Sequence, residues 1–231
     1  MAPEAIHNRI LSSLPAPTLD RLRPSLRLVE TRGGEVLEEA GKPVRHLYFV
    51  NRGLVSLVSM MRDGRVVEAR VVGNEGMTTP HVLFWSNRSI LQSIVQVPGS
   101  AFRIEYQKLK DLVDDDSILR DRLERYLHFA VISLAHAGAC NRLHRMDERC
   151  CRWLLIAHDS AGFDTFPITH EFLAMMLGVR RSGISVIAKQ LQDRGVITYS
   201  RGQMTILDRD ALEEGACECY ETLRTEYASL L

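Results

Sequence analysis

Residues 168–207 read ITHEFLAMMLGVRRSGISVIAKQLQDRGVITYSRGQMTIL, and this stretch decides the fold of the C-terminal part of the chain. Thr169 is suited to cap a short apolar helix that ends at Gly178, where a tight turn between helices needs a positive φ angle. A second helix is predicted from about residue 180 to residue 193, and Gly195 stands just past its end. Two short helices joined by a tight turn predict a helix-turn-helix unit.

The second helix of this unit has two contrasting faces. Ile184, Ile187, Ala188 and Leu191 share one face and are expected to be buried, whereas the opposite face and the first turn are polar and basic. Arginine and serine side chains on such a helix can donate to phosphates and to base edges in the major groove. The helix dipole also favours phosphate at the N-terminal end. The alternative to a DNA-binding unit is a purely structural hairpin of two amphipathic helices.

The residues that follow favour DNA binding over a simple hairpin. Two strand-like runs, 196–200 and 203–207, flank Arg201 and Gly202, which can form the tight turn of a wing. Basic residues outnumber acidic ones by five to two in residues 166–207, although the whole chain has 29 of each. Because the local field attracts phosphate, zero net charge does not exclude DNA. The expected DNA-contacting residues are Thr169, Arg180, Arg181, Ser182, Ser185, Val186, Lys189 and Arg201.

The N-terminal half has a different sequence pattern, which favours strands over long helices. Residues 5–24 predict two short helices, which Pro15 and Pro17 interrupt. Apolar β-branched runs punctuated by glycine then recur about every ten residues, which is typical of a compact antiparallel sandwich or barrel. Strands are expected at residues 46–50, 54–61, 66–72 and 93–97. Arg62, Asp63 and Gly64 predict a hairpin turn between the second and third of these.

A long helix connects the two halves. From about Tyr106 the apolar period changes to that of a helix, and an apolar stripe with alternating steps of three and four residues extends to Cys140. A second helix is expected over residues 146–158. The stripe either packs on the chain's own β-domain or pairs with its twin in a homodimer, and we favour the homodimer. The expected interface residues are Leu119, Leu123, Tyr126, Leu127, Ala130, Leu134 and Ala137.

This order of parts resembles the Crp/Fnr superfamily of bacterial transcription regulators, most strongly over residues 168–207. The resemblance implies an α+β fold with a jelly-roll-like antiparallel β-roll and N-terminal helices (1–110), a long dimerisation helix (111–142) and a winged helix-turn-helix domain (143–231). It also implies a homodimer that binds double-stranded DNA at a pseudo-palindromic promoter site and contacts RNA polymerase. Many relatives carry Arg, Glu and a further Arg in the recognition helix. The matching residues here are Arg181, Ser182 and Val186, so a different operator is expected.

The resemblance does not supply a signal. Relatives that bind cyclic AMP carry a Gly-Glu pair and later an Arg followed by Ser or Ala. The matching candidate effector-pocket residues here are Gly73, Asn74, Glu75, Gly76, Gln92 and Ser93, none of which is cationic. Because a phosphodiester needs a charge-assisted donor, we predict a degenerate pocket that does not bind cyclic AMP. The N-terminal cysteine cluster of oxygen-sensing relatives is also missing, since the first cysteine is Cys140.

Other function classes find less support. The 45% apolar content excludes general disorder, and the most apolar stretch, residues 129–140, is too short to span a membrane. With no secretory signal visible, we expect a cytoplasmic protein with reduced thiols. The five cysteines show no zinc-finger spacing, so no metal or cofactor is expected. No nucleophile elbow or Walker loop occurs, so an enzyme is not expected. A β-roll that senses a ligand or redox change and regulates a protein partner remains the alternative.

Overall fold

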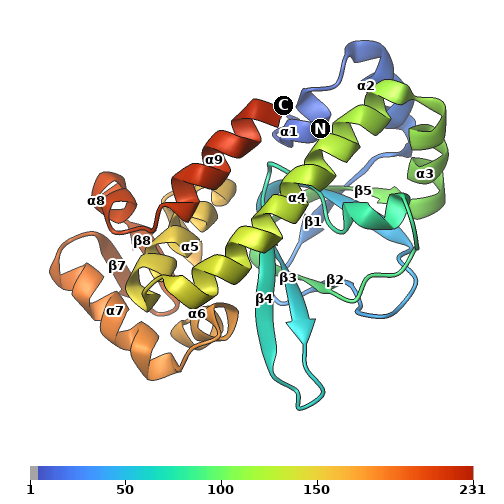
Figure 1. Cartoon of the computed structure of the whole chain (residues 1–231). Coiled ribbons are helices and arrows are strands. Elements are labelled where there is room, and N and C mark those ends of the chain that lie inside the picture. The colour runs from blue at the N-terminus through green and yellow to red at the C-terminus, as the bar shows by residue number, and fades with distance from the viewer. Residues whose placement is uncertain (1–4, 231) are drawn as a thin grey trace.

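The structure is a computed structural model that describes residues 5–230. A β-roll and a smaller C-terminal unit lie on either side of the long helix α4 (Ser117–Leu143), as Figure 1 shows. The roll contains α1 (Arg9–Ser12), α2 (Ala16–Leu22), η1 (Arg23–Ser25), β1 (Arg27–Thr31), β2 (Val36–Glu38), β3 (His46–Met60), β4 (Val66–Val72), η2 (Pro80–Leu83), β5 (Gln92–Glu105) and α3 (Tyr106–Asp115). The C-terminal unit contains α5 (Met146–Ala161), β6 (Thr165–Pro167), α6 (His170–Leu177), α7 (Arg181–Asp193), β7 (Ile197–Ser200), β8 (Gln203–Ile206), α8 (Arg209–Glu214) and α9 (Cys219–Leu230).

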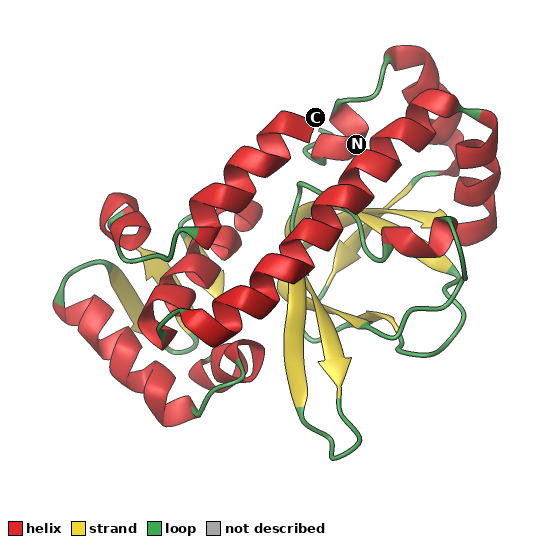
Figure 2. Ribbon diagram, in the orientation of Figure 1, coloured by secondary structure: helices red, strands yellow, loops and turns green. Residues whose placement is uncertain are grey.

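The roll is an antiparallel sheet with the strand order β1-β5-β3-β4. Strand β1 pairs with the second half of β5, and β2 pairs with the first residues of β5. The hairpin turn expected between β3 and β4 is confirmed: the Met61 amide donates to the Arg65 carbonyl oxygen at 2.8 Å, and Gly64 has a φ of 84°. This hairpin projects from the roll beside the C-terminal unit (Figure 2). The turn therefore forms where the sequence placed a residue able to take positive φ.

The expected division of the sheet into shorter strands is wrong. Residues 46–50 and 54–61 were expected as separate strands, but β3 runs through both, and β5 continues well past residue 97. The register of β3 against β5 shifts around Gly53, so the strands bend at a bulge instead of ending there. A Cβ at Gly53 would lie 2.4 Å from the Val97 carbonyl oxygen, so only glycine fits this crossing.

The first half of α4 belongs to the core of the roll. Asp116 caps the helix by accepting from the Ile118 and Leu119 amides. Leu119, Leu123 and Tyr126 are at most 1% exposed and pack with residues of β3 and η2. The structure therefore corrects the expected dimer interface: Leu119, Leu123, Tyr126 and Ala130 are buried within one protomer, because the helix lies directly across the roll.

The C-terminal unit has its own core and is also tied to the roll. Trp153, Phe166 and Leu173 lie at the centre of a cluster built from α5, α6, α7 and the small sheet β6-β8-β7. Helix α9 then returns along α4 toward the N-terminal helices (Figure 1). There the Tyr227 hydroxyl donates to the Glu75 carbonyl oxygen at 2.5 Å. The last helix thus connects the unit that holds the helix-turn-helix to the roll.

The expected domain boundaries can be placed on these elements. Residue 110 falls inside α3, and residue 142 is the penultimate residue of α4. Residues 1–4 and 231, which belong to the first and third expected domains, lie outside the described part of the chain. Within residues 5–230, no helix combines the length and the apolar character needed to cross a membrane.

Candidate nucleic-acid interface and effector site

The helix-turn-helix forms as the sequence predicted. The Thr169 hydroxyl accepts from the Phe172 amide at 3.1 Å and caps α6, which ends at Gly178 with a φ of 65°. Helix α7 follows after a short turn and ends before Gly195, whose φ is 73°. The apolar face of α7 is buried as expected, and Ile184 at its centre is fully inaccessible. The opposite face of α7 is therefore held toward solvent by the packing of its apolar side.

The outer face of α7 presents most of the expected DNA-contacting residues. Arg181, Ser182, Val186 and Lys189 are exposed, and 57% of Val186 is accessible, which leaves its methyl groups free to meet a thymine methyl. Lys189 forms an ion pair with Asp193 at 3.1 Å, one turn further along the helix. Arg180 is exposed just before the helix begins. This face offers cations, a hydroxyl and an apolar group, the three kinds of contact that base edges and phosphates accept.

Ser185 is held more tightly than the sequence suggested. Its hydroxyl lies 3.1 Å from His170 Nδ1 and 3.2 Å from the Arg181 carbonyl oxygen. The His170 ring stacks on Tyr199 of β7 with centroids 4.2 Å apart, and burial lowers the pKa of His170, which favours the neutral imidazole. His170 thus connects α6, α7 and the wing, a role that its position in the sequence gave no sign of.

The wing is a two-residue hairpin. Strands β7 and β8 pair directly, and the turn residues Arg201 and Gly202 have φ angles of 50° and 77°. Two successive positive φ angles are the signature of a type I′ turn. Strand β6 covers the other edge of β8. The exposed Arg201 side chain therefore stands at the tip of a rigid ribbon next to α7.

The candidate effector-pocket residues lie on two segments of the roll that have different partners. Gln92 and Ser93 lie on β5, and the Ser93 hydroxyl donates to the Glu38 carboxylate inside the roll at 2.5 Å. The Thr78 and Thr79 hydroxyls donate to the same carboxylate at 2.5 and 3.0 Å. Burial raises the pKa of Glu38, while these hydroxyl groups oppose the rise. An acidic group therefore lies beside Ser93, where a nucleotide phosphate would need a cation.

Gly73, Asn74, Glu75 and Gly76 form the turn after β4, just before Thr78 and Thr79 in the chain. A Cβ at Gly76 would lie 1.8 Å from the Tyr126 hydroxyl, so this turn touches α4 directly. The nearby Arg70 donates to Tyr126 at 3.0 Å and lies 3.7 Å from the Glu75 carboxylate. Arg70 therefore uses Nη2 on these protein groups, whereas its Nη1 is buried without a hydrogen-bond partner in the described part of the chain.

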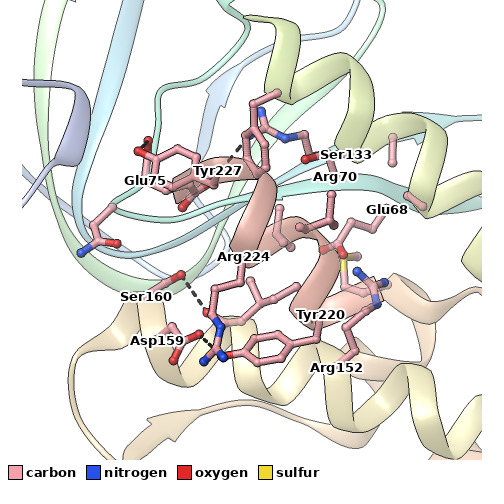
Figure 3. A pocket seen from close by; sticks show the side chains of 18 of the residues that line it. Glu68, Arg70, Glu75, Ser133, Arg152, Asp159, Ser160, Tyr220, Arg224 and Tyr227 are labelled. Atoms are coloured by element: carbon pink, nitrogen blue, oxygen red, sulfur yellow. Dashed lines mark hydrogen bonds and ion pairs between the residues drawn. The ribbon is translucent and has the colours of Figure 1, made fainter. Parts of the chain in front are cut away.

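Asn74 and Glu75 instead line a cavity between the two units, with a volume of about 170 Å³ (Figure 3). Its walls come from β4, α4, α5 and α9, and Ala137, an expected interface residue, also faces it. Glu68 of β4 accepts from Trp153 Nε1 of α5 at 3.1 Å across the boundary between the units. Burial raises the pKa of Glu68 to about 7. The cavity therefore lies at the boundary between the two units, beside a hydrogen bond that joins them.

A second cluster lies at the far end of α4. Cys140, His144, Cys217 and Cys219 bring their sulfur and ring nitrogen atoms within 4.8 Å of one another. All three cysteines are buried free thiols. Zinc-finger spacings, which the sequence lacks, could not reveal this cluster, because its two halves are far apart in the sequence. The local signals were the spacing of Cys140 and His144 by one helical turn and the Cys-x-Cys of residues 217–219.

Comparison with known proteins agrees with these observations. A model of the cyclic nucleotide-binding domain matches residues 28–116, and a model of the Crp-like helix-turn-helix domain matches residues 148–214. No curated protein sequence matches the chain.

Solved structures share this fold over most of the chain at low sequence identity. A Crp/Fnr-family transcriptional regulator from Eubacterium rectale has a TM-score of 0.67 at 18% identity, covering 95% of this chain and 99% of its own. FixK2 from Bradyrhizobium japonicum has a TM-score of 0.69 at 15% identity, covering 83% and 98%. A CRP-family regulator from Thermus thermophilus has a TM-score of 0.67 at 22% identity, covering 81% and 96%.

The Eubacterium rectale and Thermus thermophilus structures are described as transcription regulators. They give no support to an enzymatic function for this chain. The two matched domain models fall on the roll and on the helix-turn-helix unit of this chain, one on each side of α4. This chain belongs to the Crp/Fnr family of transcription regulators and carries that family's DNA-binding helix-turn-helix.

Proposed function

We propose that the protein is a homodimeric regulator that recognises a pseudo-palindromic DNA site through the outer face of α7. The observation that carries this proposal is the free guanidinium of Arg181, which forms no ion pair within residues 5–230 and lies in the first turn of α7. Arginine in this position can bind guanine or a phosphate. Ser182, Val186 and Lys189 supply further contacts, and Arg201 of the wing supplies a phosphate contact.

The second half of α4 supports dimerisation. Leu127, Val131, Leu134 and Gly138 follow one another at steps of four, three and four residues on the side away from the roll. Val131 is 58% exposed and Leu134 is 39% exposed, although both are large and apolar. Pairing this stripe with its copy would cover apolar surface and place two α7 helices in successive major grooves. The proposed interface keeps Leu127 and Leu134 from the sequence-based set and adds Val131.

The roll is proposed to be a sensor with a degenerate nucleotide pocket. Glu38 already accepts from Thr78, Thr79 and Ser93, so three hydroxyl groups of the interior are committed to a carboxylate. A cyclic nucleotide would bring a second anion beside it without a cationic partner, which is costly in a buried site. We expect no stabilisation by cyclic AMP in a thermal-shift measurement, and a marked rise in melting temperature would contradict the degenerate pocket.

The family resemblance also supports contact with RNA polymerase and a cytoplasmic location. The alternative, a roll that senses a ligand or a redox change and regulates a protein partner, gains support from the cavity between the units and from the thiol cluster. The two functions differ in one requirement, because only a DNA-binding regulator needs the outer face of α7.

The decisive experiment is selection of bound sequences from a random DNA pool with the full chain, followed by binding of the selected site to variants. Each dimer carries two Arg181 residues, and losing a base-contacting arginine costs about 1–3 kcal/mol each. We therefore expect Arg181→Ala to weaken binding at least ~30-fold, which corresponds to about 2 kcal/mol. Lys189→Ala should have a smaller effect, because Asp193 already engages the ammonium group.

Arg27→Ala, which changes an exposed arginine on β1 of the roll, is the matched control and should bind like the unmodified protein. An unchanged affinity of Arg181→Ala would refute the assignment of α7 as the recognition helix. Failure to enrich any DNA sequence would favour the protein-partner alternative.

A further inference from the structure

The end of α4 and the start of α9 meet in a small thiol-rich cluster. Cys140 lies in the last turn of α4 and His144 is the residue that ends the helix, where its amide donates to the Cys140 carbonyl oxygen at 3.1 Å. Cys217 and Cys219 flank Glu218 where the chain enters α9. The thiols are 0–5% exposed and the histidine is half-buried, which removes the cluster from solvent. No described hydrogen bond outside the cluster uses the three sulfur atoms.

Two distances within the cluster match those of a single tetrahedral ion, and all four ligand atoms lie within 4.8 Å of one another. Cys140 Sγ lies 3.6 Å from Cys217 Sγ, and Cys219 Sγ lies 3.7 Å from His144 Nδ1. A tetrahedral zinc ion holds thiolate sulfur at about 2.3 Å and imidazole nitrogen at about 2.0–2.1 Å, so neighbouring ligand atoms are separated by roughly 3.5–3.8 Å. An ion could therefore be accommodated with side-chain adjustments alone.

His144 is oriented for this role by its other nitrogen. Nε2 lies 3.0 Å from the Glu218 carboxylate, which leaves Nδ1 directed toward the thiols. Histidine ligands of metal ions commonly donate their second ring N–H to a carboxylate, which fixes the tautomer and the ring orientation. Glu218 therefore fits a supporting position next to the ligands, which explains why an acidic residue lies between two buried cysteines.

The charge around the cluster also fits a metal–thiolate site. Three thiolates and one divalent cation leave a net charge of −1, which needs compensation in a buried place. Arg149 and Arg152 of α5 are 8% and 9% exposed, and both interact electrostatically with cluster thiols. The Nε atoms of both arginines are buried without a hydrogen-bond partner in the described part of the chain. Two buried cations thus lie beside the cluster with unused hydrogen-bonding capacity.

We propose that Cys140, His144, Cys217 and Cys219 bind one zinc-type metal ion that fastens the end of α4 to the start of α9. Three cysteines and one histidine form a closed donor set, which is the composition of structural zinc sites and leaves no position for a substrate. A multi-iron cluster fits less well, because its ligands bind different iron atoms and need more space than this compact group provides. Since α9 also contacts the roll, the ion fixes the helix-turn-helix unit relative to α4.

The test is metal analysis of the full chain, purified under reducing conditions and loaded with Zn²⁺. We expect one zinc per chain, and Co²⁺ in its place should give the intense visible absorption of a tetrahedral site with thiolate charge-transfer bands. Cys217→Ala should lose this stoichiometric ion. Cys150→Ala, which removes a buried thiol from α5 outside the cluster, is the matched control and should retain it.

Two further variants keep the test independent of folding. His144→Asn changes a half-buried residue and should also lose the tetrahedral Co²⁺ spectrum, with the circular dichroism of the chain unchanged. Glu218→Gln keeps all four ligands and should weaken zinc binding by about 10–100-fold, as expected for a carboxylate behind a ligating histidine.

Three results would overturn the proposal: less than stoichiometric zinc in the reduced unmodified protein, retention of the ion by Cys217→Ala, or iron with acid-labile sulfide in place of zinc. A disulfide between Cys140 and Cys217 in protein that binds no metal when reduced would assign the cluster to redox chemistry instead. None of these measurements uses DNA, so they do not depend on the proposed operator binding.

Discussion

Replacing Glu68 by glutamine should make the protein more stable at alkaline pH. The Glu68 carboxylate lies between the roll and the C-terminal unit, where it accepts from Trp153 Nε1 at 3.1 Å and from the Ser56 hydroxyl. Burial raises its pKa from 4.5 to about 7. The folded state therefore holds a proton that the unfolded chain releases at lower pH. The resulting stabilisation is complete below about pH 4.5 and is lost as the pH rises through about 7.

The size of the effect follows from the pKa. One pKa unit corresponds to about 1.36 kcal/mol, so a rise of about 2.5 units sets an upper limit of about 3.4 kcal/mol. Glu68 also lines the cavity and is only half-buried, so solvent reduces the cost of its charge. We expect Glu68→Gln to raise the free energy of unfolding by roughly 2 kcal/mol at pH 8 and by less than about 0.5 kcal/mol at pH 4.5. Glutamine keeps an oxygen that can accept from Trp153.

The assay is urea unfolding at both pH values, followed by Trp153 fluorescence in a background in which the exposed Trp85 is replaced by phenylalanine. Glu30→Gln makes the same chemical change at an exposed residue of β1. It should leave the difference in the free energy of unfolding between pH 4.5 and pH 8 the same as in the parent protein. Equal stability of Glu68→Gln and its parent at pH 8 would refute the reasoning. So would a loss of stability at both pH values, which would mean that the charge itself is needed.

Three further outcomes test the dimer stripe and the contacts between the units. Leu134→Glu should give monomers in analytical ultracentrifugation. The control Ile118→Glu, at an exposed site near the start of α4, should remain dimeric. A dimeric Leu134→Glu would refute the proposed dimer interface along the second half of α4. Gly76→Ala places a Cβ about 1.8 Å from a tyrosine hydroxyl and should lower the free energy of unfolding by about 1–3 kcal/mol in urea titrations. Tyr227→Phe removes the hydroxyl that donates to the Glu75 carbonyl oxygen, so it should cost about 1 kcal/mol and speed backbone hydrogen exchange in α9; unchanged exchange would contradict the link.

Local chemistry explains what the sequence predicted well. Gly178, Gly195 and Gly202 take positive φ angles at the turn, the helix end and the wing where glycine was expected to allow them. The helix-turn-helix is built from contacts between residues near one another in the chain, so periodicity and turn residues were sufficient. The DNA-contacting role of individual side chains remains a prediction, because it depends on a partner.

Long-range packing explains what the sequence predicted poorly. Helix α4 has apolar residues on two sides, and periodicity alone could not tell that Leu123 faces the roll whereas Leu134 faces solvent. The sulfur atoms of Cys140 and Cys217 meet although 77 positions separate them, so the two local cysteine signals could not be joined into one cluster without the fold. Ser93 was placed beside Glu75 by resemblance, but the fold directs its hydroxyl to Glu38 instead.

The turn of the wing shows a cost that binding can impose on a fold. Arg201 adopts a φ of 50°, a conformation that side chains with a Cβ disfavour and that asparagine or glycine adopts with less strain. A protein optimised for stability alone would place asparagine there, and directed selection for heat resistance should find Arg201→Asn repeatedly. Selection for transcriptional output should restore arginine. The tip of the wing is therefore a position where stability and activity favour different residues, and sequence drift there would indicate a regulator that no longer needs its wing.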